Sequence, residues 1–103
     1  MAIMSLGQIK PTIGRIVWYW PQPNFQGWMD HSQPLAAIIA YVHSDVLINI
    51  GFYDQNGKAE FATSVKLWQG DGDRPDSFFA EWMPYQKGQA AKYEALEKTL
   101  GAK

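Results

Sequence analysis

Two histidines are the side chains best suited to acid–base chemistry near neutral pH. His31 and His43 each lie beside a serine and an aspartate, in the segments 30–32 and 43–45. Adjacent residues of an extended chain point in different directions, so neither segment can form a catalytic triad by itself. The sequence also lacks a Gly-x-Ser-x-Gly nucleophile elbow and a glycine-rich phosphate loop. We therefore expect no catalytic residue and predict that the protein is not an enzyme.

A group of carboxylates in the segment 71–81 has the spacing that can attract calcium. A calcium-hand loop that began at Asp71 would need an oxygen ligand at its fifth position and a glutamate at its twelfth. Pro75 and Trp82 stand at those positions. The chain has no cysteine, which excludes disulfides, thiol catalysis and sulfur-rich zinc sites. We expect a solvated acidic loop at 69–77, no metal and no cofactor.

Aromatic side chains concentrate between Gly14 and Pro34, on a predicted strand and in the long loop 21–34 that follows it. Ring faces on a loop can stack on a nucleobase or another flat ligand, while amides and imidazoles contact the edges of that ligand. A charged ligand would also need a cation nearby. We therefore predict a ligand-binding site made of these residues: Arg15, Trp18, Trp20, Asn24, Phe25, Gln26, Trp28, His31 and Lys66.

Burial in the core is the competing interpretation for these aromatics, because large rings supply much of the apolar area that a short chain can bury. It applies most to Trp18 and Trp20, which lie on the predicted strand. It applies less to Phe25 and Trp28, which lie in the loop. Both interpretations stay open at this point.

Five apolar segments bounded by proline, glycine and asparagine predict strands at 12–20, 35–42, 46–53, 59–67 and 78–83. Asn56-Gly57 predicts a hairpin turn between the third and fourth strands. The loop 21–34 has fourteen residues, more than most connections. The segment 88–100 predicts a helix, with Tyr93 and Leu96 on its apolar stripe. We predict a mainly β fold, either a small curled antiparallel sheet or an SH3-like barrel of about five strands, with one C-terminal helix.

The strand patterns also predict burial. The strand 12–20 is apolar on both faces, so we expect both to be covered, and we expect 35–42 to be a buried central strand. The strand 59–67 alternates, with Phe61, Thr63, Val65 and Leu67 on one face, so we expect a half-exposed strand. In domain terms we predict a flexible N-terminal arm at 1–11 and a single β-rich domain at 12–103.

The composition of the chain limits the kinds of partner that it can bind. The net charge of -1 over 103 residues gives no field that would attract nucleic acid or an anionic membrane, and no apolar segment approaches the ~20 residues that span a bilayer. A domain of this size buries only about 60–65% of the surface of its unfolded chain, so self-association would add stability. We expect a homo-oligomer that contacts no membrane and no nucleic acid.

Four segments carry a resemblance to a known family. They read PTIGRIVWYW at 11–20, LAAIIAYV at 35–42, DQNG at 54–57 and EWMPYQKGQA at 81–90. In these segments the chain resembles a family of small tailed-phage and prophage proteins. The resemblance implies a phage setting, where small non-enzymatic proteins build virions or blunt host defence. One recurring device there is an oligomeric sponge that encloses a nucleotide-derived immune signal without cleaving it.

We therefore predict a phage-encoded, non-enzymatic binding protein of the host cytoplasm that sequesters a nucleotide-derived immune signalling molecule. The pocket would lie at a homo-oligomer interface, because a chain of 103 residues has little room for an enclosed cavity. Two alternatives remain open. One is a minor virion or decoration protein, and the other is an inhibitor that binds a host defence protein directly.

Overall fold

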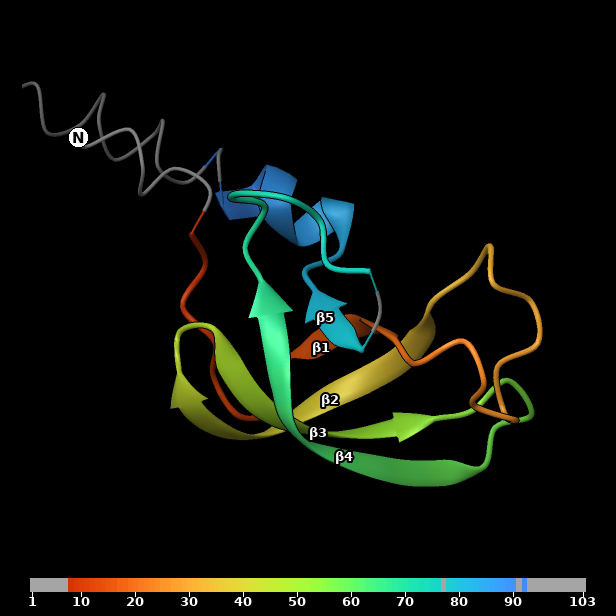
Figure 1. Ribbon diagram of the computed structural model, residues 1–103. Coiled ribbons are helices and arrows are strands. Elements are labelled where there is room, and N and C mark those ends of the chain that lie inside the picture. The colour runs from red at the N-terminus through yellow and green to blue at the C-terminus, as the bar shows by residue number, and fades with distance from the viewer. Residues whose placement is uncertain (1–7, 77, 91, 93–103) are drawn as a thin grey trace, which may run out of the picture.

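The computed structural model describes residues 8–76, 78–90 and 92, which form a closed five-stranded barrel and a short helix (Figure 1). The strands are β1 (Ile16–Trp20), β2 (Leu35–Ser44), β3 (Leu47–Tyr53), β4 (Ala59–Trp68) and β5 (Phe79–Glu81). This architecture confirms the predicted mainly β fold with one C-terminal helix, and the strand order is compatible with an SH3-like barrel.

The barrel closes through one pairing that the sequence did not indicate. β1 pairs antiparallel with β2 and β5, and β3 pairs antiparallel with β2 and β4. The last pair, β4 with β5, is parallel. Parallel neighbours need a crossover connection rather than a tight hairpin. The acidic loop between β4 and β5 is that connection.

The core lies inside the barrel. Alternate residues of each strand point inward, as in β2, where Leu35, Ala37 and Ile39 are buried while Ala36 and Ile38 are exposed. Trp82, which follows β5, is the largest fully buried side chain among the described residues. The cluster is continuous from β1 to Trp82.

A β-bulge in β4 overturns the predicted alternation of that strand. Ile50 pairs with Ala62 and Ile48 with Val65, so two residues of β4 oppose Asn49 alone. Ser64 has a positive φ of 53°, and its backbone N–H donates to Asn49 Oδ1 at 2.8 Å. The extra residue reverses which face each side chain occupies. Val65 is therefore buried as expected, but Phe61 is 77% exposed.

The predicted coverage of both faces of the first two strands was also wrong. Ile16 and Ile38 are 40% and 39% exposed on the outer face of the barrel. Trp18 and Trp20 are half-buried. In the strand 35–42, side chains therefore point alternately into the barrel and out to solvent. It is not a central strand buried on both faces.

The helix begins earlier than predicted. Residues 84–90 and 92 are helical, so Pro84 starts the helix instead of merely ending the strand, consistent with the preference of proline for a first helical position. Gln86 ties this turn to β1, because its Nε2 donates to the Ile16 carbonyl at 2.9 Å. The remainder of the predicted 88–100 helix lies outside the described residues.

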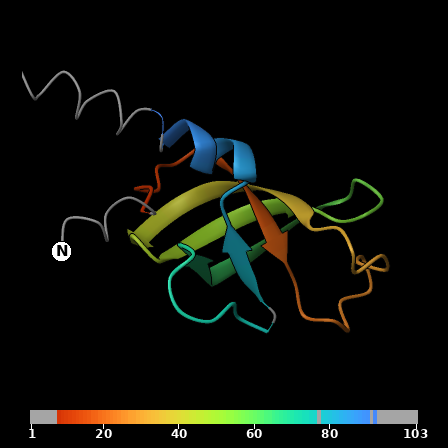
Figure 2. The same ribbon diagram turned by 90° about the horizontal axis from the view of Figure 1, so that it is seen from above.

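The expected N-terminal arm 1–11 lies partly outside the described residues, at 1–7. Its described part contacts the barrel: the Ile9 N–H donates to Gln69 Oε1 at 3.1 Å, and Gln69 Nε2 donates to the Ile9 carbonyl at 2.9 Å. Pro11 is buried. The attachment therefore begins by Ile9. Figure 2 shows the loop 21–34 at the side of the barrel away from the helix. Among the described residues no helix is long and apolar enough to cross a membrane.

Candidate functional site

The long loop 21–34 is folded against the β3–β4 hairpin, and both lie at the same end of the barrel (Figure 1). Gln55 Oε1 accepts from the backbone N–H of Met29 at 2.7 Å and of Asp30 at 2.9 Å, while the Gln55 N–H donates to the Gly27 carbonyl at 2.8 Å. A Cβ at Gly27 would lie 2.6 Å from the Asp54 Cβ, so only glycine permits this approach. The loop is therefore fixed by specific contacts.

Asp30 organises the tip of that loop. Its carboxylate accepts from the hydroxyl of Ser32 at 2.6 Å, from the backbone N–H of Ser32 at 3.0 Å and from Gln33 Nε2 at 3.1 Å. The hydroxyl bond and then the backbone bond from Ser32 hold the pKa of Asp30 below its usual range, because they stabilise the carboxylate. This turn positions the chain between Trp28 and Pro34.

Trp28 belongs to the core. It is 7% exposed, and its Nε1 donates to the Gln33 carbonyl at 2.7 Å. His31 stacks on it with ring centroids 4.1 Å apart, and Trp20 meets it edge-on at 6.1 Å. Its indole face is therefore already covered by a neighbour in the same loop.

Phe25, by contrast, lines an apolar hollow of about 270 Å³. The hollow lies where β1 and β3 end and β4 and β5 begin. Tyr19 and Phe52 form its floor, and the rings of Phe25, Phe61 and Phe78 form its walls. Phe25 packs edge-on against Phe52 at 5.7 Å, which fixes the loop side of the hollow to the barrel. Rings from five separate segments therefore meet at one place.

Tyr19 is a buried residue of that floor that carries a polar group. The residue is 3% exposed, and its ring lies 4.8 Å from Phe52 and 6.3 Å from Phe78. Within the part of the chain that the structure describes, its hydroxyl makes no hydrogen bond. Burial raises the pKa of Tyr19 to about 12, so the phenol is neutral at physiological pH. A buried hydroxyl without a partner is costly, and a ligand acceptor would remove that cost.

Phe78 is held in a strained conformation at the edge of the hollow. Its φ of 64° is in the left-handed region, which bulky residues rarely adopt, and its backbone N–H donates to the Trp20 carbonyl at 2.8 Å. Strained residues of this kind concentrate at functional sites. Phe78 is 39% exposed, so much of its ring remains open.

Two of the nine predicted binding residues, Asn24 and Phe25, line this hollow. Arg15 lies in the turn before β1, and Lys66 lies on β4; both are exposed and neither lines the hollow. Gln26 is exposed in the loop. Trp18 lines a different surface hollow, together with residues such as Met83.

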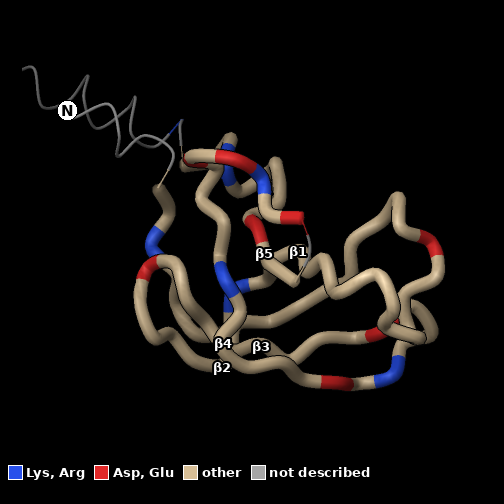
Figure 3. The backbone as a smooth tube through the Cα atoms, in the orientation of Figure 1, with Lys and Arg blue, Asp and Glu red and all other residues tan. Residues whose placement is uncertain are grey.

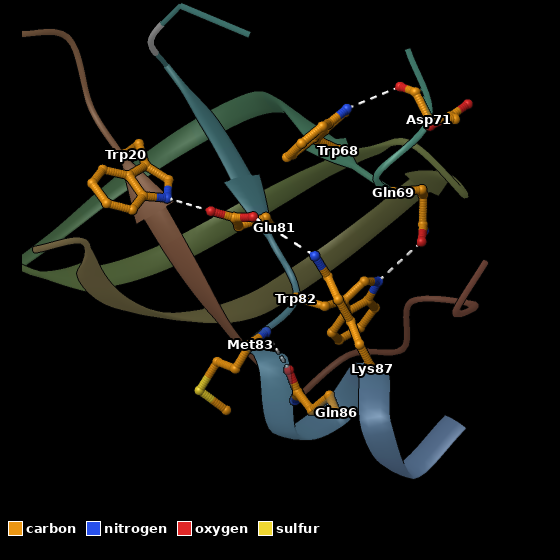
Figure 4. A network of polar contacts seen from close by, with 9 residues as sticks. All are labelled: Trp20, Trp68, Gln69, Asp71, Glu81, Trp82, Met83, Gln86 and Lys87. Carbon is orange, nitrogen blue, oxygen red and sulfur yellow. Dashed lines mark hydrogen bonds and ion pairs between the residues drawn. The ribbon is translucent and has the colours of Figure 1, made fainter. Parts of the chain in front are cut away.

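Trp20 belongs to a polar network on the outer side of β5 (Figure 4). Its Nε1 donates to Glu81 Oε2 at 2.7 Å, and Lys87 Nζ lies 3.9 Å from Glu81 Oε1. The guanidinium of Arg74 lies 4.8 Å from the Trp20 ring and 4.9 Å from the Phe79 ring. These contacts fasten the acidic loop and the helix to the barrel, so the Trp20 side chain is already engaged.

Seven of the nine residues that line the hollow were missed in the sequence, namely Tyr19, Pro21, Gln22, Phe52, Phe61, Ala62 and Phe78. Gln22 lies next to Pro21 at the start of the loop and gave no signal of its own. Phe61 was assigned to the wrong face because the bulge in β4 was not foreseen. Phe78 was treated as strand, although it precedes β5 and adopts a positive φ.

The other chemical candidates do not form sites in the described residues. His31 Nε2 lies 3.1 Å from the Trp28 carbonyl oxygen, and His43 Nε2 lies 3.0 Å from Asn49 Oδ1. No group of three or more histidine, aspartate or glutamate side chains in the described part of the chain gathers closely enough to hold a metal ion. No protein-family model, no curated protein and no solved structure matches the chain.

Proposed function

We propose that the protein is a non-enzymatic binding protein that holds the flat aromatic group of a small nucleotide-like molecule in the hollow between Phe25, Phe61 and Phe78. The observation that carries the proposal is the convergence of these rings around buried Tyr19, whose hydroxyl makes no hydrogen bond to another described residue. Apolar walls with a few polar groups are the usual composition of a small-molecule site.

The residues divide the work of recognition. Stacking of a base on an aromatic side chain contributes about 1–3 kcal/mol, and each base has a ring face to offer. The Tyr19 hydroxyl supplies a hydrogen bond from the floor. At the rim, the exposed amides of Gln22 and Asn24 can donate to and accept from the edge of the ring.

Charge decides how a nucleotide would lie. Among the described residues no lysine or arginine lines the hollow, so a phosphate placed inside it would be desolvated without a described counter-charge. The aromatic end of the ligand therefore enters, and the phosphates stay outside. Under this arrangement the base contributes most of the affinity, and Arg15 and Lys66 make no direct contact within the hollow.

The resemblance to small tailed-phage and prophage proteins supports a biological setting for this binding. We propose that the protein acts in the host cytoplasm and sequesters a nucleotide-derived immune signalling molecule without cleaving it. A sponge of this kind needs affinity for its ligand and no turnover, which fits a site made of rings and amides.

Calorimetry with cyclic dinucleotides and ADP-ribose derivatives tests the proposal. The native protein should bind at least one of them, and chromatography of the released ligand should recover it intact. Phe25→Ala should weaken binding about tenfold or more, because it removes one stacking surface. Met29→Ala is the matched control from the same loop, since Met29 is 77% exposed and does not line the hollow. Absence of binding to the whole panel would sink the proposal.

A second candidate function rests on exposed apolar side chains of the outer barrel surface, one of which, Phe61, also lines the hollow. Ile38, Tyr53 and Phe61 are 39%, 47% and 77% exposed, and such surfaces often mark protein-docking sites. This favours a minor virion or decoration protein, or an inhibitor that binds a host defence protein. Stoichiometric copies in purified particles would support the virion function, whereas capture of one host protein by the native chain but not by Phe61→Ser would support the inhibitor.

A further inference from the structure

The outer surface of the barrel carries an uncharged row of cross-strand neighbours, which we call the apolar row. Ile16 of β1 pairs with Ile38 of β2, Ile38 with Gly51 of β3, and Gly51 with Phe61 of β4. Side chains of directly paired residues point to the same face of a sheet and lie about 5 Å apart. Strands β1, β2 and β3 contain no charged residue at all (Figure 3).

The apolar row is a local feature of these strands. A solvated sheet face is normally polar. Beyond the bulges, the outer positions include polar and charged side chains, such as His43, Ser64 and Lys66. The row therefore differs from that end of the outer surface, and water is a poor partner for it.

The shape of the row is self-complementary. Phe61 is 77% exposed and stands beside Gly51, which has no side chain. A Cβ at Gly51 would meet nothing closer than the Glu60 carbonyl oxygen at 4.0 Å, so the space above Gly51 is open. A protruding ring and an open position of the same strand pair are thus direct neighbours.

We propose that a second copy of this chain covers the apolar row, with Phe61 of each protomer packed over Gly51 of the other. A two-fold axis that runs along the strands between β3 and β4 exchanges these two positions, as an isologous interface requires. The row brings no like charges together when it faces itself. Nucleic acid or an anionic membrane would instead need basic side chains at this place.

The proposed interface and the proposed ligand site share one residue, Phe61, which lines the hollow. Gly51 does not line the hollow. A change at Gly51 therefore tests the dimer alone, and a change at Phe25 tests the hollow alone.

Sedimentation equilibrium of the full chain over a wide concentration range measures the assembly. The native protein should have twice the 11.7 kDa mass of one chain. Phe61→Ser should raise the dissociation constant roughly 100-fold, since two buried phenylalanines are lost per dimer. Gly51→Val has room within one protomer and suits a strand, so it should fold but exclude the ring of the partner.

Met29→Ser is the control, because Met29 has the same 77% exposure as Phe61 but lies away from the row. It should remain a dimer. A native protein that stays monomeric at all concentrations overturns the proposal, as does a dimer that persists in Phe61→Ser. If circular dichroism shows that Gly51→Val is unfolded, the comparison of Phe61→Ser with Met29→Ser decides. A Gly51→Val variant that is monomeric supports the interface. If that variant also binds ligand as the native chain does, the hollow is supported separately.

Discussion

Trp28 and His31 stack with their ring centroids 4.1 Å apart and their planes inclined by 22°. The histidine covers one face of the indole, and Trp28 belongs to the core cluster with 7% of its surface exposed, so it anchors the loop 21–34 to the core. Because Trp28 is engaged in this way, the best candidate for ligand binding in the loop is Phe25, which lines the hollow.

Trp28→Ala should lower the free energy of unfolding by about 3–5 kcal/mol, the usual cost of emptying a buried tryptophan site. The loss includes the hydrogen bond from Nε1 to the Gln33 carbonyl. Urea denaturation measures it, and Trp28→Phe serves if the alanine variant does not fold. Met29→Ala, at a neighbouring position that is 77% exposed, is the control. A loss below about 0.5 kcal/mol in Trp28→Ala would place Trp28 on the surface.

Gly27→Ala should destabilise the contact between the loop and the hairpin, by about 1–3 kcal/mol, because the new Cβ would overlap Asp54. Gly88→Ala is a matched control. Position 88 is helical and a Cβ there meets nothing within 4 Å, so alanine should be neutral or add up to about 1 kcal/mol. Equal effects of the two changes in urea denaturation would contradict the observed packing.

Tyr19 should ionise at a pH well above the ordinary pKa of a tyrosine. Its folded pKa of about 12 lies above the ordinary value of 10.0, so folding favours the neutral phenol. That contribution to stability is complete below pH 10 and is lost as the pH rises toward 12. A spectrophotometric titration should show one late tyrosinate step that Tyr19→Phe removes. If Tyr19→Phe instead loses an ordinary step near pH 10 and keeps the late one, the Tyr19 hydroxyl is not buried.

Asp30 should make the loop sensitive to acid. Because its folded pKa is lowered, its contribution is present above the ordinary carboxyl pKa of about 4 and is lost as the pH falls below it. The hydrogen-exchange protection factor of the Ser32 amide, corrected for intrinsic exchange, should fall with the pH. Asp30→Ala should show the low value at neutral pH. A protection factor that is the same in both proteins would remove Asp30 from this role.

Much of the fold could be predicted because apolar periodicity and turn residues report strands directly. The Asn56-Gly57 hairpin and the five apolar segments fixed the number of strands and their approximate ranges. The bulge in β4 could not be predicted, since it depends on a hydrogen bond from Ser64 to Asn49, fifteen residues away. The parallel β4–β5 pair is equally non-local.

The candidate site was harder to predict than the fold. A loop sequence does not reveal which ring turns inward, so Trp28 was grouped with Phe25 although the structure buries one and leaves the other at a hollow. Phe61 points to the outer face of the barrel because of the bulge in β4, which could not be predicted. The position of the Phe78 ring depends on a positive φ, in a backbone whose N–H donates to the Trp20 carbonyl. The sequence does not indicate this long-range bond.

Chemical-shift mapping with a bound nucleotide tests the central claim most directly. Nitrogen-15-labelled native protein would be titrated with the ligand that calorimetry identifies. The account predicts the largest amide shifts at Asn24, Phe25, Phe61 and Phe78, with small shifts at Arg15 and Lys66. Saturating shifts centred on any other surface, or none at the hollow, would contradict it.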